Sequence, residues 1–251
     1  MSVGAVAIAS LALSACNSSS KTGGSSPSAS PSVAPAQALA NSITALKGQA
    51  FDIKLNLGGL DGTGSIDPPH NSGTIEAKGS QAGVSVDITF TQIANDAWAK
   101  LDLGPMSGQL GIDPHKWMHL DLTKLTGSQS KPFDLSGSGD AFDLAGLVKS
   151  VSNVKQTDAT HLTGTIDLTK ATGLSAPDSQ TMNKAGASAK SVPFTATLDN
   201  QGRLTELKVT GSSDLTADFQ ISNFGSPAEV KAPPASDVVQ APDQIYQFFN
   251  S

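Results

Sequence analysis

Cysteine is almost absent from the sequence: Cys16 is the only one among its 251 residues. A lone cysteine cannot close a disulfide within the chain, and no second thiol exists to share a metal ion. A free reactive thiol and a disulfide between two copies of the chain remain open. The residues around Cys16 favour a more specific role.

Positive charge is also scarce. Sixteen Lys and Arg stand against 22 Asp and Glu, the formal net charge is −6, and the basic residues are scattered rather than clustered. Nucleic acids and anionic membrane surfaces attract clustered positive charge. The composition therefore argues against nucleic acid as a partner and against electrostatic attraction to anionic lipid.

The apolar segment that opens the sequence is too short to cross a membrane. Residues 1–15 carry no charge and are almost all Ala, Val, Leu, Ile, Ser and Gly. A transmembrane helix needs about 20 apolar residues, whereas this length is typical of the apolar core of a signal peptide. No Lys or Arg precedes Lys21. The positive start of a signal peptide is therefore missing, and we expect the natural chain to begin further upstream.

The end of this segment, Leu13-Ser14-Ala15-Cys16, resembles the bacterial lipobox, which is an aliphatic residue and two small residues before a cysteine. The resemblance implies that the Cys16 thiol receives diacylglycerol and that cleavage before Cys16 makes it the first mature residue. Two acyl chains anchor a protein far more firmly than one. The alternative is a cytoplasmic protein with an apolar tail and an accidental cysteine.

A polar tether follows the cysteine. Residues 17–35 are nearly all Ser, Gly, Pro, Ala and Thr, and Lys21 is their one charge. Such a segment buries too little apolar surface to become ordered, and about 20 flexible residues span roughly 25 Å. We therefore predict a signal peptide over residues 1–15, a lipidated cysteine with a disordered tether over 16–35, and one folded domain over 36–251.

The folded part alternates apolar and polar residues, which is typical of strands with one buried face. The clearest alternation covers residues 51–57, 84–91, 162–169, 192–198 and 215–221. Weaker strands are expected over residues 62–67, 73–79, 97–103, 116–122 and 203–210, and turns at 67–71, 95–96 and 199–202. The pattern predicts a large antiparallel sheet that is covered on one side.

Helical periodicity is confined to a few segments, namely residues 36–47, 140–151, 177–189 and 243–249. Eight or more strands make a sheet roughly 40 Å wide, whereas one helix covers about 10 Å of that width. A few helices therefore cover the apolar face incompletely. Either loops such as residues 104–114 and 127–139 fill the gap, or a cavity between sheet and helices holds a lipid.

Large apolar side chains are the candidate lining of such a cavity. They are Phe90, Trp98, Trp117, Phe142, Leu144, Leu147, Val148 and Phe194. The stripe from Phe142 to Val148 is the best candidate for a cavity wall, because it is the longest apolar helical stripe available to oppose the sheet. For each side chain the alternative is ordinary core packing.

No set of residues typical of a catalytic or metal site is found. His115 and His119 have the spacing of zinc ligands on a helix, but no Glu follows His115 and Asp113-Pro114 disfavours a helix there. On a strand the two rings would lie about 13 Å apart. Residues 136–140, Ser-Gly-Ser-Gly-Asp, lack the order of a nucleophile loop and the lysine of a phosphate loop. We expect no enzyme activity, no cofactor and no metal; the alternative is an extracellular hydrolase with a serine beside His119 or His161.

The order of segments along the chain resembles a known family. The segments are NDAWAKLDL (95–103) with KWMHLDLTKL (116–125), the helix and Gly-containing strand of 140–171, the hairpin VPFTATLDNQGRLTELKVT (192–210), and FGSPAEVKAPP (224–234). With the lipobox and tether, they resemble the mycobacterial LppX/LprG-type lipoproteins, whose fold is similar to that of the periplasmic carriers LolA and LolB.

This resemblance implies an α+β fold, a LolA-like half-barrel in which a large curved antiparallel sheet wraps over a few helices. It implies an apolar cavity that binds, and can transport, acylated lipids or lipoglycans. It also implies a monomer anchored to the extracytoplasmic face of an actinobacterial cell membrane, with an envelope transporter as a partner. The alternative is a structural or signalling lipoprotein with a packed core that binds another envelope protein.

Overall fold

The computed structural model describes residues 33–81, 83–124, 144–171, 179–211, 215–226 and 228–250. Val33–Ser251 form one compact unit. The predicted signal peptide, Cys16, most of the tether, Phe142 and the segment 136–140 lie outside the described residues.

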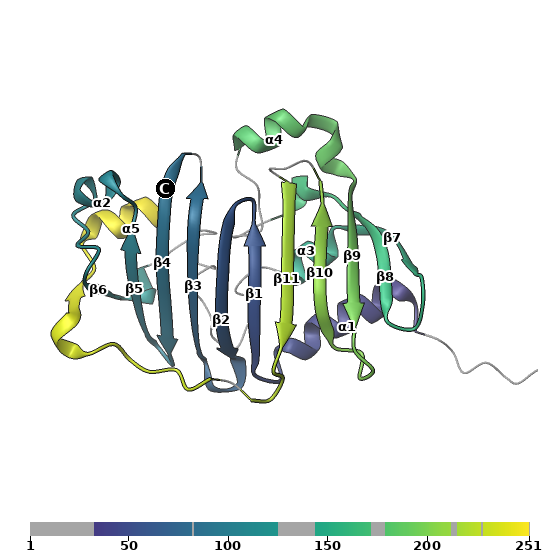
Figure 1. Ribbon diagram of the computed structural model, residues 1–251, viewed down its shortest axis with the longest axis horizontal. Coiled ribbons are helices and arrows are strands. Elements are labelled where there is room, and N and C mark those ends of the chain that lie inside the picture. The colour runs from purple at the N-terminus through teal and green to yellow at the C-terminus, as the bar shows by residue number, and fades with distance from the viewer. Residues whose placement is uncertain are drawn as a thin grey trace, which may run out of the picture. The chain divides into compact units, whose positions relative to one another are not determined.

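Twelve strands form one curved sheet, and neighbouring strands are antiparallel except for β12 and β6 (Figure 1). From edge to edge they are β12 (Val238–Gln240), β6 (Trp117–Leu120), β5 (Asp96–Asp102), β4 (Val84–Ile93), β3 (Ser72–Gln81), β2 (Leu60–Asp67), β1 (Phe51–Leu57), β11 (Thr216–Ser222), β10 (Leu204–Thr210), β9 (Val192–Leu198), β8 (His161–Ile166) and β7 (Val151–Gln156). Strands β1 to β6 follow one another in chain order from the middle of the sheet toward one edge. The chain then continues with β7 at the opposite edge, and β8 to β11 lead back to the middle, where β11 pairs with β1.

The described helices are α1 (Pro35–Leu46), α2 (Pro105–Gln109), α3 (Leu144–Lys149), α4 (Ser179–Ala185) and α5 (Asp243–Asn250). Of these, α1, α3 and α5 lie on one side of the sheet (Figure 1). In Figure 1, α1 and α3 are seen behind β8 to β11, α5 behind β5 and β4, and α4 at the upper end of the sheet. Pro35 starts α1 at a position where its missing N–H costs nothing. Side chains at helical spacing then bury one face of α1, which packs against β7, β10 and α3.

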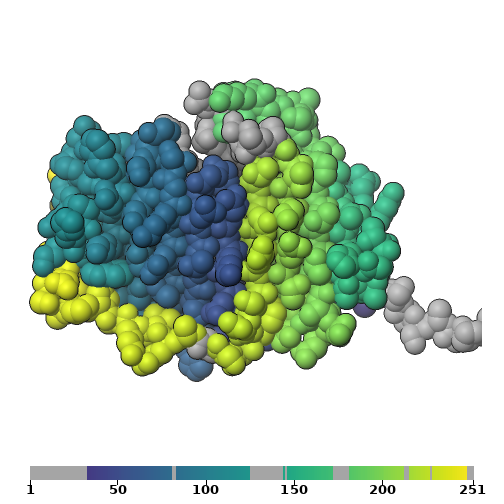
Figure 2. Space-filling model, in the orientation of Figure 1, coloured from purple at the N-terminus to yellow at the C-terminus, as the bar shows by residue number. Residues whose placement is uncertain are grey.

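Alternation along each strand gives the sheet two different faces. We call the side that packs with α1, α3 and α5 the inner face and the opposite side the outer face. Cross-strand pairing aligns inner-face residues into rows; one such row, from β5 to β8, is Leu101, Ile88, Ala77, Gly62, Leu55, Phe219, Leu207, Ala196 and Leu162. Most of this row is buried in a hydrophobic cluster that includes residues of all three helices. The outer face is turned toward the viewer in Figure 2.

The predicted fold class is confirmed at this level: the protein is α+β, with a large curved antiparallel sheet and few helices. Each predicted strand segment contains a strand. The helix expected over residues 140–151 is wrong at its end, because α3 stops at Lys149 and Val151 begins β7. Ser150 ends the helix there: its hydroxyl and its backbone N–H both donate to the Leu147 carbonyl.

Two strands end earlier than the alternation predicts, and a repeated tetrapeptide explains both ends. Asp-Leu-Thr-Lys occurs at residues 121–124, after β6, and at 167–170, after β8. In each copy the aspartate accepts hydrogen bonds from the threonine hydroxyl and backbone N–H, and a short 3₁₀ turn follows. The threonine hydroxyl bond is the main cause that holds the pKa of Asp121 and of Asp167 below its ordinary value.

Gly64 in β2 is required by close packing, and replacing it with alanine is expected to destabilise the fold by about 1–3 kcal/mol. A Cβ atom at this position would lie 2.5 Å from the Thr74 carbonyl oxygen and 2.9 Å from Ile75 Cγ1. Urea unfolding measures the effect. Gly108→Ala in α2 is the control, since nothing lies within 4 Å of its added Cβ; there a change of no more than about 1 kcal/mol is expected. Equal losses in both variants would contradict this packing argument.

Candidate functional site

The predicted cavity residues separate into two groups. Phe90, Leu144, Leu147 and Phe194 are buried in one hydrophobic cluster, and Val148 packs against it half-buried. The Phe194 ring fills the space over Gly164 of the neighbouring strand, where an added Cβ would lie 2.6 Å from Phe194 Cε1. These side chains share the inner side of the sheet and pack as core.

Trp98 and Trp117 form the second group, on the outer face. In β5, Ala97, Ala99 and Leu101 are buried, so Trp98 points to the other side. In β6, Met118 is buried and Trp117 faces outward in the same way. The expectation that both tryptophans line one cavity with Phe90 therefore does not agree with their placement. The sequence contains an indication of this outward position. Trp98, Lys100 and Asp102 are alternate residues of one strand, so they lie on the same face as each other.

Trp98 instead belongs to a polar–aromatic group at one flank of the outer face. Its ring centroid lies 5.7 Å from that of His119, its cross-strand partner on β6. His119 Nε2 lies 3.1 Å from Asp96 Oδ1. This contact orients the imidazole beside the indole.

The apolar inner face is open at one end of the sheet. A row of five paired residues there is half-buried: Val86, Gly79, Leu60, Leu57 and Ala217. We call it the mouth row. In the next row toward the middle of the sheet, Ala77, Gly62, Leu55 and Phe219 are buried, and Ile88 is half-buried. The mouth row lies at the end of the β1–β2 and β3–β4 turns, the upper end in Figure 1.

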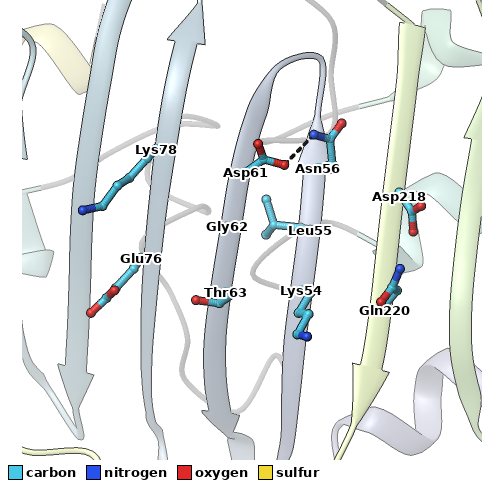
Figure 3. A pocket seen from close by; sticks show the side chains of 10 residues that line it. All are labelled: Lys54, Leu55, Asn56, Asp61, Gly62, Thr63, Glu76, Lys78, Asp218 and Gln220. Carbon is cyan, nitrogen blue, oxygen red and sulfur yellow. Dashed lines mark hydrogen bonds between the residues drawn. The ribbon is translucent and has the colours of Figure 1, made fainter.

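Next to the mouth row, apolar side chains of the inner face lie across glycines of the neighbouring strand. An added Cβ at Gly62 would lie 2.9 Å from Leu55 Cδ1, so the leucine side chain lies across the glycine, as Figure 3 shows. Ile75 lies across Gly64 in the same manner. Among the helices that the structure describes, none is drawn behind β1 to β3 in Figure 1. Leu55, Gly62 and Ala77 are nevertheless buried here, and the mouth row beside them stays half-buried.

A groove of about 450 Å³ lies on the outer face, across β3, β2, β1 and β11 (Figure 3). Its eight polar side chains form two cross-strand rows. One consists of Lys78, Asp61, Asn56 and Asp218, and the other of Glu76, Thr63, Lys54 and Gln220. Leu55 and Gly62 complete the lining.

The row from Lys78 to Asp218, which we call the paired row, is held by contacts within the protein. Asn56 Nδ2 donates to Asp61 Oδ1 at 2.7 Å. Lys78 forms an ion pair with Asp87 at 3.1 Å, and Asp218 forms one with Lys208 at 3.2 Å. The Asp218 contact is the largest of the causes that raise the pKa of Lys208.

The histidines do not assemble catalytic or metal chemistry in the described part of the chain. His119 contacts Asp96, and His161 Nδ1 contacts Asp158 and the Thr160 hydroxyl. Among these residues no serine hydroxyl bonds either ring. His115 lies in the turn before β6, where its N–H donates to Asp113 Oδ1. No group of three or more His, Cys, Asp or Glu side chains gathers within the described residues.

Asp158 is expected to titrate near pH 2. The backbone N–H of Thr160 and then the His161 ring stabilise the carboxylate and lower its pKa from 3.8 to about 2. A lowered pKa in the folded state stabilises the fold above the unfolded value, and this contribution is lost as pH falls through about 2. Carboxyl ¹³C NMR measures the midpoint; a midpoint at 3.8 or above would contradict the assigned contacts. In His161→Ala the pKa is expected to rise but stay below 3.8, because the Thr160 bond remains.

No protein-family model matches the chain, and a search of curated proteins finds no match. No helix within the described residues is long and apolar enough to cross a membrane. The resemblance to the LppX/LprG-type lipoproteins therefore stays a prediction.

Proposed function

We propose that this protein is a lipid-anchored protein of the cell envelope that binds an acylated lipid on the inner face of its sheet. The observation that carries the proposal is the mouth row, where apolar inner-face residues of five strands stay half-buried although most of the next row is buried. Partly exposed apolar surface that continues into a hydrophobic core is the kind of surface that lipid chains cover.

The dimensions suit an acyl chain. Five strands at about 4.8 Å spacing make the mouth row roughly 19 Å long. One leaflet of a bilayer core is about 15 Å thick, which is the reach of one acyl chain. At roughly 0.8 kcal/mol per methylene, burying a 16-carbon chain supplies of order 10 kcal/mol before ordering costs. A chain on this row needs no charged partner, which agrees with the acidic composition.

The one-sided arrangement supports the finer fold assignment, a LolA-like half-barrel. The inner face holds the core and contacts α1, α3 and α5, and β7 and β12 remain as edges rather than pairing with each other. In this proposal Cys16 carries the lipid anchor and the Ser-rich tether holds the domain clear of the headgroups. The domain then acts at the extracytoplasmic surface of the membrane without making or breaking a bond.

Native mass spectrometry of the unit from Val33 onward, purified from an actinobacterial host, tests the proposal. The anchor is absent from this segment, so any lipid detected belongs to the folded domain. We expect a discrete mass increment that organic solvent removes. An apo mass, with no uptake of added phospholipid or glycolipid, would contradict the proposal and favour an interaction module with a packed core.

A further inference from the structure

One row of polar side chains on the outer face has no partners within the described protein. It is the second row of the groove, extended by pairing to six adjacent strands from β5 to β11: Lys100, Thr89, Glu76, Thr63, Lys54 and Gln220. Among the described residues, none of the six side chains forms a hydrogen bond or an ion pair. We call it the free row.

The rows on either side of the free row are different, although they lie on the same face. The paired row on one side is held by ion pairs and an amide–carboxylate bond. On the other side, the Thr74 and Thr91 hydroxyls lie 3.0 Å apart, and Ser65 Oγ accepts a bond from the Ala228 N–H. Exposure alone therefore does not explain the unused groups, because neighbouring polar residues on the same strands do find partners.

The charges around the groove leave no positive excess. Lys78 and Asp218 form ion pairs with Asp87 and Lys208, and Lys208 also contacts Glu206, the cross-strand partner of Gln220. Lys54 and Lys100 are offset by Glu76 and Asp61. A site without net positive charge has no electrostatic preference for a phosphate or another anion.

The hydrogen-bonding groups alternate in kind along the free row. Lysine ammonium groups donate, the glutamate carboxylate accepts, and the threonine hydroxyl and glutamine amide do both. A sugar hydroxyl also donates and accepts, so a chain of sugars can use every group in the row. At about 4.8 Å per strand, six strands span roughly 24 Å, and Trp98 stands two residues along β5 from Lys100. Its half-buried ring offers a flat apolar surface at that end of the row.

From this geometry we infer that the outer face binds a neutral oligosaccharide, which lies along the free row in the groove of Figure 3. This site is separate from the lipid site, because it occupies the opposite face of the same strands. The inference does not depend on lipid binding.

Titration of the full chain carrying Cys16→Ser with cellohexaose, maltohexaose and mannohexaose, followed by ¹⁵N NMR, tests the inference. At least one sugar is expected to shift the amides of the free row and the Trp98 indole, and added NaCl is expected to leave the affinity unchanged. Several results overturn the proposal: no shift with any of the three up to about 10 mM, shifts confined to the inner face, or binding that salt abolishes.

Two variants test whether the sugar contacts the free row, and a third variant serves as the control. Thr63→Val keeps the branched shape but removes the hydroxyl, and Gln220→Ala removes an exposed amide; each is expected to weaken binding about fivefold. Lys155→Ala removes an exposed lysine from β7, outside the groove, and is expected to leave the affinity unchanged. If Thr63→Val and Gln220→Ala both bind like the unaltered chain, the free row is not the site. Lipid loading in Thr63→Val and Gln220→Ala, measured separately, is expected to stay normal.

Discussion

Replacing Ala217 with Trp is expected to remove lipid binding while the chain stays folded. Ala217 sits in the mouth row, half-buried between Leu57 and Val209 on the neighbouring strands. An indole there would cover the surface on which the acyl chain lies. If half of a 16-carbon chain is displaced, about 6 kcal/mol of transfer free energy is lost, which corresponds to more than a thousandfold in Kd. Displacement of a fluorescent fatty acid measures the change.

Gln240→Trp is the matched control for this variant. Gln240 is exposed on the edge strand β12, so the same indole is added to the domain away from the mouth row. Fatty-acid binding is expected to be normal in Gln240→Trp, and circular dichroism is expected to show the same thermal transition in both variants within a few degrees. Unchanged lipid binding in a folded Ala217→Trp protein would show that the chain does not lie on the mouth row.

The second large effect is expected at Cys16. Cys16→Ser removes the only thiol in the sequence, and with it the only atom that can carry the thioether-linked lipid. Because the acyl chains supply the membrane affinity in this proposal, the protein is expected to move almost completely from the membrane to the soluble fraction. Fractionation of cells labelled with radioactive palmitate measures both location and lipidation.

Ser18→Ala in the predicted tether is the control for Cys16→Ser, since it leaves the lipobox intact. It is expected to keep both the label and the membrane location. Retention of Cys16→Ser on the membrane, or palmitate label that persists without the thiol, would contradict the anchor.

The strands that could be predicted are those with undisturbed alternation. β1 and β9 follow the period of two over seven residues each, and their buried positions are the apolar ones. β7 could not be found in this way, because Asn153 has a positive φ of 55° and the pairing with β8 shifts between Ser152 and Lys155. A bulge of this kind breaks the alternation that the prediction relies on. β12 has only three residues, too few for any period.

The candidate sites depend on the register in which neighbouring strands pair, and the sequence of a single strand does not reveal that register. The mouth row combines residues from β4, β3, β2, β1 and β11, which only the pairing of the strands brings into one row. Likewise, Lys54 and Lys78 look alike in the sequence, but within the described part of the chain only Lys78 has an ion partner across the strands. Their size makes Trp98 and Trp117 candidates for a cavity lining. The alternation of side chains along β5 and β6, however, puts both on the outer face.

Photocrosslinking with a phospholipid that carries a diazirine on its acyl chain tests the central claim most directly. After irradiation of the Cys16→Ser chain, tryptic peptides are sequenced by mass spectrometry to find the labelled residues. Labels are expected on Val86, Leu60, Leu57 and Ala217, the mouth-row side chains of four strands. Labels confined to the outer face, or no saturable labelling at all, would contradict a lipid site on the inner face of the sheet.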